Sequence, residues 1–189
     1  MSQKLLAILK EQFGPALIET HGEHGDDTAV VKTSAWLEVS KFLRDDPRCD
    51  MQMMVDLCAV DYPRREPRFD VVMHLHSINL KHRLRLKTRV GDEEGNGAEV
   101  ASVCSIWPGA NWFERETFDL MGIVFIGHPD LRRILLYPEF VGHPLRKDYP
   151  ADKAQPLVPY REGYEKQAPF DRFEGMSFGR QVFRSGKVD

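Results

Sequence analysis

Cysteine is scarce in this sequence. The three cysteines, Cys49, Cys58 and Cys104, lie far apart and form no Cys-x-x-Cys pair. An odd, scattered set argues against a disulfide framework and favours a reducing compartment. It also supplies too few thiolates for the usual four-cysteine iron–sulfur cluster. We therefore predict that the chain binds neither a cluster nor another metal ion.

Long apolar runs, phosphate loops and excess positive charge are also missing. No apolar run approaches the roughly 18 residues of a membrane-spanning helix, so we expect membrane contact only through partners. The N-terminus, Met1–Glu11, predicts an amphipathic helix and not a signal peptide. No glycine-rich loop offers a flavin or nucleotide site. The net charge of -3 and pI near 6.2 argue against the basic footprint of a nucleic-acid-binding protein.

The spacing of apolar residues predicts an α+β fold. Helical spacing predicts helices over residues 3–13, 35–44, 100–107 and 111–122. Apolar runs and alternation predict strands over 16–20, 28–32, 57–60, 68–77 and 81–90. The resulting order, α-β-β-α-β-β-β-α-α, does not alternate strictly, which argues against a doubly wound sheet. We expect a single domain with a two-layer mixed β-sheet and helices covering one face.

The last two strands form a predicted hairpin with one basic face, made by Lys81, Arg83, Arg85, Lys87 and Arg89. This face fits either an acidic partner surface or a solvated surface whose cations protect an exposed edge strand. On the first strand of the hairpin, His74 and His76 would share a face, as a metal-binding pair does. No third ligand follows at a suitable spacing, so ordinary sheet histidines are favoured.

The helix predicted over residues 111–122 mixes charges with aromatic residues. Asn111 suits the N-cap, with Glu114 three residues later as in a capping box. Gly122 suits the left-handed position after a helix, and Arg115 and Asp119 are spaced to form an ion pair. Such a helix fits contact with its own domain on one side and a partner on the other. A surface helix with solvated charges is the alternative, and no motif positions a substrate for acid–base chemistry.

A second block, Gly142–Pro150, reads Gly-His-Pro-Leu-Arg-Lys-Asp-Tyr-Pro. Its prolines restrict the backbone, and Arg146 offers a planar fork for a carboxylate. Together with Trp112–Ile123, this block closely resembles the family of the C subunit of bacterial NADH–quinone oxidoreductase, the 30 kDa subunit of respiratory complex I. The resemblance extends more loosely from about Leu37 through Pro150.

The resemblance implies a non-catalytic, cofactor-free subunit of the peripheral arm, on the cytoplasmic side of the cell inner membrane. Its expected partners are the quinone-site (49 kDa-like) subunit and the subunit with the terminal iron–sulfur cluster. The whole complex uses FMN, iron–sulfur clusters, NADH and quinone. A subunit of a related membrane-bound hydrogenase would share the same blocks. A stand-alone soluble enzyme is a further alternative.

Residues 151–189 follow a predicted domain of residues 1–150 and show neither helical nor strand periodicity. They are richer in aromatic residues than a solvated disordered tail. We interpret them as an extended C-terminal arm that lies on a partner, with packing against the chain's own domain as the alternative. The candidate interface residues come from the helix, the second block and the arm: Glu114, Arg115, Glu116, Asp119, His143, Pro144, Arg146, Lys147, Asp148, Tyr160, Tyr164, Phe170 and Phe173.

Overall fold

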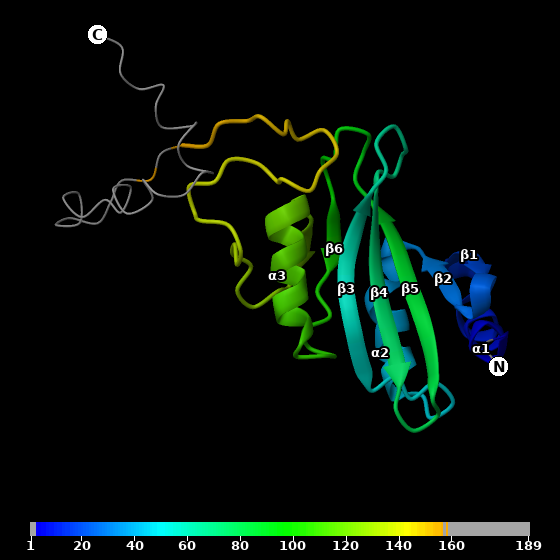
Figure 1. Ribbon diagram of the computed structural model, residues 1–189. Coiled ribbons are helices and arrows are strands. Elements are labelled where there is room, and N and C mark those ends of the chain that lie inside the picture. Colours follow the sequence, from blue (N-terminus) through cyan, green and yellow to red (C-terminus); the bar gives the residue numbers. More distant parts are fainter. Residues whose placement is uncertain (1–2, 157, 159–189) are drawn as a thin grey trace, which may run out of the picture. The chain divides into compact units, whose positions relative to one another are not determined.

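The computed structural model describes residues 3–156 and 158, and residues up to Gln155 form one compact unit (Figure 1). The helices are α1 (Gln3–Phe13), α2 (Trp36–Asp45) and α3 (Ala110–Met121). The strands are β1 (Leu17–His21), β2 (Thr28–Val31), β3 (Met53–Asp61), β4 (Phe69–Ser77), β5 (His82–Val90), β6 (Glu99–Ala101) and β7 (Val124–Ile126). Short 3-10 turns occupy Gly14–Ala16, Glu23–Gly25 and Thr33–Ala35.

Five of the strands form one mixed sheet in the order β1-β2-β5-β4-β3. The predicted hairpin is present as the antiparallel pair β4–β5, with Phe69 opposite Val90 and Ser77 opposite His82. Strands β2 and β5 are parallel, whereas the other neighbouring pairs are antiparallel. The predicted α+β class with a mixed sheet is therefore confirmed.

One face of this sheet carries the hydrophobic core. Alternate residues of β4, from Phe69 to Leu75, belong to the core cluster because successive strand residues point to opposite faces. Helix α2 packs Trp36, Val39 and Leu43 into the same cluster, and α1 adds Leu5, Leu6 and Leu9. Helix α3 lies beside β3 (Figure 1), where the Thr117 hydroxyl is 3.5 Å from the Leu57 carbonyl oxygen.

The helix predicted over residues 100–107 is wrong. Residues Val100 and Ala101 belong to β6, which pairs in parallel with β7 in a separate two-stranded sheet. The chain then makes a turn in which the amides of Ile106 and Trp107 both donate to the Val103 carbonyl. Long-range pairing with β7 removes these residues from the local helical pattern, and a three-residue strand is too short to show a period of its own.

The other face of the sheet carries the basic residues of β5, together with acidic partners. Arg85 lies 3.3 Å from Asp26, and Arg89 lies 2.8 Å from Glu19. Strand β5 is central, between β2 and β4, so protection of an exposed edge does not explain its cations. Ion pairing across the sheet face explains them in part.

We expect Phe69→Ala to lower the free energy of unfolding by about 3–5 kcal/mol, because it leaves a cavity in the core. The Phe69 ring is fully buried and contacts the loop glycines Gly91 and Gly95. Equilibrium urea unfolding measures the change. The matched control is Ile78→Ala at the exposed hairpin tip, with an expected change within about 0.5 kcal/mol. Equal losses in both variants would contradict this assignment of the core.

Candidate partner interface

Glu114 faces the interior of the domain. Its side chain is fully buried, and its Oε1 accepts the Val103 N–H at 2.7 Å. Its Oε2 accepts the Ser102 hydroxyl at 2.7 Å. The predicted capping box is therefore wrong. Helix α3 begins after Gly109 with no side-chain cap, because the glutamate carboxylate instead binds the loop that follows β6.

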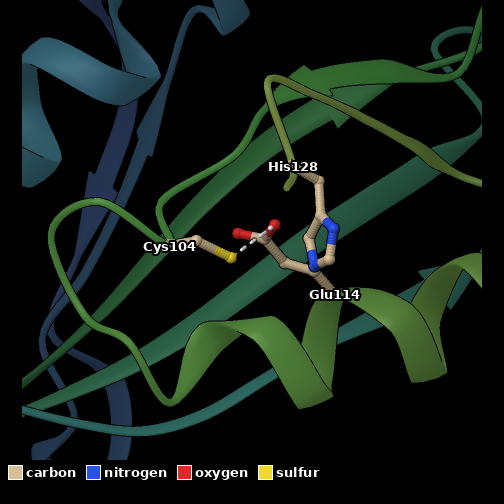
Figure 2. Close-up of side chains that lie close together, drawn as sticks. All are labelled: Cys104, Glu114 and His128. Atoms are coloured by element: carbon tan, nitrogen blue, oxygen red, sulfur yellow. Dashed lines mark hydrogen bonds between the residues drawn. The ribbon is translucent and has the colours of Figure 1, made fainter. Parts of the chain in front are cut away.

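Two further side chains meet this carboxylate, as Figure 2 shows. The Cys104 thiol donates to Glu114 Oε2 at 3.3 Å, and the His128 ring lies on the other side. One ligand-type atom from each of Cys104, Glu114 and His128 lies within 4.8 Å of the others. Burial raises the pKa of Glu114, and the hydrogen bonds from Ser102, Val103 and Cys104 counteract it only in part.

Asp119 fixes the loop that follows β7. The buried carboxylate accepts an Arg133 guanidinium N–H on Oδ1 at 2.7 Å. Its Oδ2 accepts the backbone N–H groups of Ile134, Leu135 and Leu136 at 3.0, 2.8 and 2.8 Å. Burial opposes ionisation, but these hydrogen bonds together outweigh it and hold the pKa of Asp119 below its usual value. The ionised carboxylate thus holds this loop against the end of α3.

The predicted pair between Arg115 and Asp119 is wrong, because both residues bind the loop instead. Arg115 donates to the Arg132 and Arg133 carbonyls at 3.1 and 3.2 Å. Arg133 continues the connection with donations to the Phe140 and Gly142 carbonyls at 3.0 and 3.1 Å. Side chains of the helix and loop therefore satisfy backbone groups that no helix or sheet pairs.

The end of α3 packs closely against the second sequence block, Gly142–Pro150. Gly122 has a left-handed backbone, with φ of 76°, as predicted. A Cβ at this position would lie 2.6 Å from the His143 ring and 2.7 Å from the Arg146 guanidinium. His143 Nδ1 lies 2.9 Å from the Asp119 carbonyl, and burial lowers the pKa of His143. Glycine is thus required here both for its backbone conformation and for its lack of a side chain.

Arg146 is bound within its own domain. Its Nε donates to the Met121 carbonyl at 2.6 Å, and its Nη2 lies 3.4 Å from the Gly95 carbonyl. The guanidinium also lies 5.1 Å from the centre of the Phe69 ring, within the range of a cation–π contact. In this structure the fork that the sequence suggested for a partner carboxylate serves internal carbonyls.

A buried ion pair anchors the same block to the sheet. Arg68 donates to both Asp61 oxygens, from Nε and Nη2, at 2.7 Å each. Its Nη1 reaches Asp148 at 2.9 Å, and the Lys147 N–H donates to Asp61 at 2.8 Å. The Arg68 hydrogen bond holds the pKa of Asp61 below its usual value. Such a bidentate pair fixes geometry as well as charge.

The exposed surface around α3 and the second sequence block contains several apolar side chains besides the charged ones. Glu116 is exposed, in contrast to Glu114 and Asp119. The exposed fractions are 62% for Trp112, 61% for Leu135, 51% for Val141 and 51% for Leu145. Pro144 is half-buried, and Lys147 and Asp148 are exposed. The arm residues Tyr160, Tyr164, Phe170 and Phe173 lie outside the described residues.

The histidines of β4 make no metal site within the described part of the chain. His76 Nδ1 lies 3.1 Å from the His82 carbonyl, and burial lowers the pKa of His74. The cluster with metal-ligand geometry is the one around Glu114. Sequence reasoning missed that cluster because its members come from a turn, a helix and a loop that no local motif connects.

We expect Asp119→Asn to lower the free energy of unfolding at pH 7 by about 3–5 kcal/mol, because it removes the only carboxylate paired with Arg133 in the described residues. The folded pKa lies below the unfolded value of about 3.9. This stabilisation is therefore complete above that value and lost as the pH falls through the folded pKa. Denaturant unfolding from about pH 5 down to about pH 2 should show a shallower decline in the variant.

The control is Asp45→Asn, which changes an exposed aspartate at the end of α2. We expect it to leave both the stability and its pH dependence unchanged within about 0.5 kcal/mol. A wild-type-like acid profile in the Asp119 variant would show that this carboxylate does not hold the loop.

The region that contains these contacts matches a known protein family and several of its members. The family model described as "Respiratory-chain NADH dehydrogenase, 30 Kd subunit" matches residues 29–155. The C subunit of NADH-quinone oxidoreductase from Xanthobacter autotrophicus is 51% identical over 146 residues, covering 77% of this chain and 68% of the relative. The corresponding protein of Methylobacterium radiotolerans is 50% identical over 150 residues, covering 79% of this chain and 66% of the relative.

Two solved structures share the fold of this chain. Nqo5, in a trypsin-resistant fragment (1-134), is 28% identical with a TM-score of 0.56, covering 68% of this chain and 99% of the fragment. A chain of the membrane-bound sulfane sulfur reductase, an archaeal respiratory membrane complex, shares the fold at 24% identity and a TM-score of 0.65. It covers 79% of this chain and 85% of its own length. The chain therefore belongs to the family of the 30 kDa subunit of respiratory-chain NADH dehydrogenase.

Proposed function

We propose that the chain is a non-catalytic scaffold in the peripheral arm of a proton-translocating NADH–quinone oxidoreductase. The observation that carries this proposal is the internal use of the charges in the two family blocks. Glu114, Asp119 and Arg146 all bind groups of their own domain. Their polar atoms hold loops in place through internal hydrogen bonds. This use fits a structural role better than a catalytic one.

The surface that these contacts fix is suited to a protein partner. Leu135 is held by Asp119, and the Leu145 amide donates to the Leu120 carbonyl at 3.1 Å, so both lie at the C-terminal half of α3. Trp112 is exposed and lies 5.6 Å from the Arg115 guanidinium. An exposed tryptophan next to an arginine matches the composition of interface centres. We propose that Glu116, Pro144, Lys147 and Asp148 form the border of this contact.

Five of the candidate residues support this surface from the inside and are not proposed to contact the partner themselves. Glu114, Arg115, Asp119, His143 and Arg146 position the loops and the end of α3. We propose that substitutions at these positions impair partner binding by displacing Leu135 and Leu145. The arm residues Tyr160, Tyr164, Phe170 and Phe173 stay a proposed second contact, beyond the described part of the chain.

The proposed partners are the quinone-site (49 kDa-like) subunit and the subunit with the terminal iron–sulfur cluster. On this proposal the redox groups, FMN and the clusters, belong to other subunits, and this chain holds neither. Within the described residues no helix has the length and apolar character needed to cross a bilayer. We propose a peripheral position on the cytoplasmic side of the cell inner membrane, reached through partners.

The alternatives have less support. The relatives at 50% and 51% identity are NADH-quinone oxidoreductase subunits, which favours that complex over a related membrane-bound hydrogenase. A stand-alone soluble enzyme would need a carboxylate available to a substrate. The two buried carboxylates of α3 are occupied by internal donors, and the exposed Glu116 stands on an outer helix face.

We expect Trp112→Ala and Glu116→Gln to lower the amount of assembled complex in membranes, because both change the outer face of α3. Loss of a central tryptophan typically weakens an interface by about 2 kcal/mol, roughly thirtyfold in affinity. Native gel electrophoresis measures the complex, and NADH–quinone reductase activity is measured on the same membranes. The matched controls are Leu37→Ala and Glu38→Gln on the exposed face of α2.

Activity should fall only in proportion to the amount of complex. Unchanged thermal unfolding of the purified variants would exclude a folding defect. Full assembly with reduced activity would mean that α3 has a direct part in the reaction, and the scaffold proposal would then be wrong.

A second expectation concerns the arm. The solved relative is described as a trypsin-resistant fragment (1-134), which supports a protease-resistant N-terminal part in this family. We expect trypsin to cut the free chain first within residues 151–189, and assembly into the complex to protect the same bonds. Mass spectrometry of timed digests identifies the cuts. Equal resistance of the arm in the free chain would favour packing against its own domain.

A further inference from the structure

The buried Glu114 carboxylate is not matched by a cation. Its donors are the Ser102 hydroxyl, the Val103 N–H and the Cys104 thiol, all of which are neutral. No lysine or arginine in the described part of the chain forms an ion pair with it, although the same helix pairs Asp119 with Arg133. A carboxylate out of water is stable when it is paired, protonated or bound to a metal ion.

The electrostatic effect of His128 lowers the pKa of Glu114 but does not outweigh burial. The Nδ1 of His128 accepts the Asp130 N–H at 2.9 Å. Its Nε2 lies 3.2 Å from the Asn111 carbonyl and donates to it. Capture of a metal ion is one way to balance the buried carboxylate.

The geometry around Glu114 favours the metal ion. The side chains of Cys104, Glu114 and His128 lie close together, although they come from a turn, a helix and a loop (Figure 2). Their ligand atoms are within 4.8 Å of one another. The Cys104 Sγ and Glu114 Oε2 are 3.3 Å apart. Typical zinc–sulfur and zinc–oxygen bonds place the two ligand atoms about 3.6 Å apart at a tetrahedral angle. These two ligands therefore already have close to the separation that zinc requires.

We infer that Cys104, Glu114 and His128 form a binding site for a divalent cation of the zinc type. Thiolate, carboxylate and imidazole are the ligands that zinc takes in proteins. Cys104 and His128 are half-buried, so an ion can reach the site from solvent. Ser102 and Val103 hold the carboxylate in place, as outer-shell donors do around protein-bound metals. This inference goes beyond the scaffold function, does not depend on it, and runs against the prediction from the sequence that the chain binds no metal ion.

Binding requires a local change at His128 and loss of the Cys104 proton. Either ring nitrogen must give up a present hydrogen bond to become a ligand, and the neighbouring Gly127 and Asp130 are exposed, so the loop can adjust. Burial raises the pKa of the Cys104 thiol to about 11. Because the ion displaces this proton, we expect tighter binding at pH 8 than at pH 6.

The test is titration of the metal-free full chain with Co²⁺, whose thiolate charge-transfer band reports a cobalt–sulfur bond. We expect one ion per chain and a band that Zn²⁺ abolishes by displacing Co²⁺. Cys104→Ser should remove the band, whereas Cys58→Ser, at a half-buried cysteine of β3, should retain it. His128→Gln should weaken binding by at least the roughly tenfold seen for supporting residues of metal sites.

Thermal unfolding with and without Zn²⁺ provides the second readout. A bound ion raises the unfolding midpoint of the wild-type chain, and the shift should vanish in Cys104→Ser. Should the cysteine variant fail to fold, His128→Gln on the exposed loop carries the same comparison. Absence of a thiolate band in the wild-type chain, or its persistence in Cys104→Ser, would overturn the site.

Discussion

The buried carboxylate of Asp119 is the contact on which the rest of this surface depends. One oxygen accepts three successive backbone N–H groups, and the other accepts Arg133. A loop with no sheet or helix of its own thereby gains a fixed backbone. Arg133 then carries the constraint on to the carbonyls of Phe140 and Gly142. A single charge buried at the end of α3 thus sets the course of the chain from residue 133 to residue 142.

A second anchor fixes the block that follows. Gly122 lets His143 and Arg146 approach the end of α3 within a distance that any side chain would prevent. Arg68 and Asp61 then bind Asp148 and the Lys147 amide from the sheet side. Because both anchors are internal, the charges of the family blocks explain how the surface is shaped. The exposed residues Trp112, Leu135 and Leu145 are the ones left to contact a partner.

Local signals in the sequence predicted the elements, and long-range contacts account for the errors. Alternation was sufficient for β4 and β5, and Gly122 marked the end of α3 because its backbone needs no distant partner. The predicted Arg115–Asp119 pair failed because the loop offered each residue several better-placed partners. Strands β6 and β7 are short and pair only with each other, so neither had a detectable period. The Cys104–Glu114–His128 cluster likewise exists only once the turn, helix and loop have folded together.

Glu114 and Asp119 are two buried carboxylates of one helix, and their surroundings differ. Both carboxylates are fully buried, yet their pKa values move in opposite directions. Asp119 has a guanidinium and a row of amides, so the charged form is favoured despite burial. Glu114 has only neutral donors, so burial prevails and the charge is unbalanced. A cation held between Cys104 and His128 would give Glu114 what Arg133 gives Asp119. Such a cation would connect the start of α3 to its neighbouring loops, as Asp119 and Arg133 already connect the end of α3 to its loop.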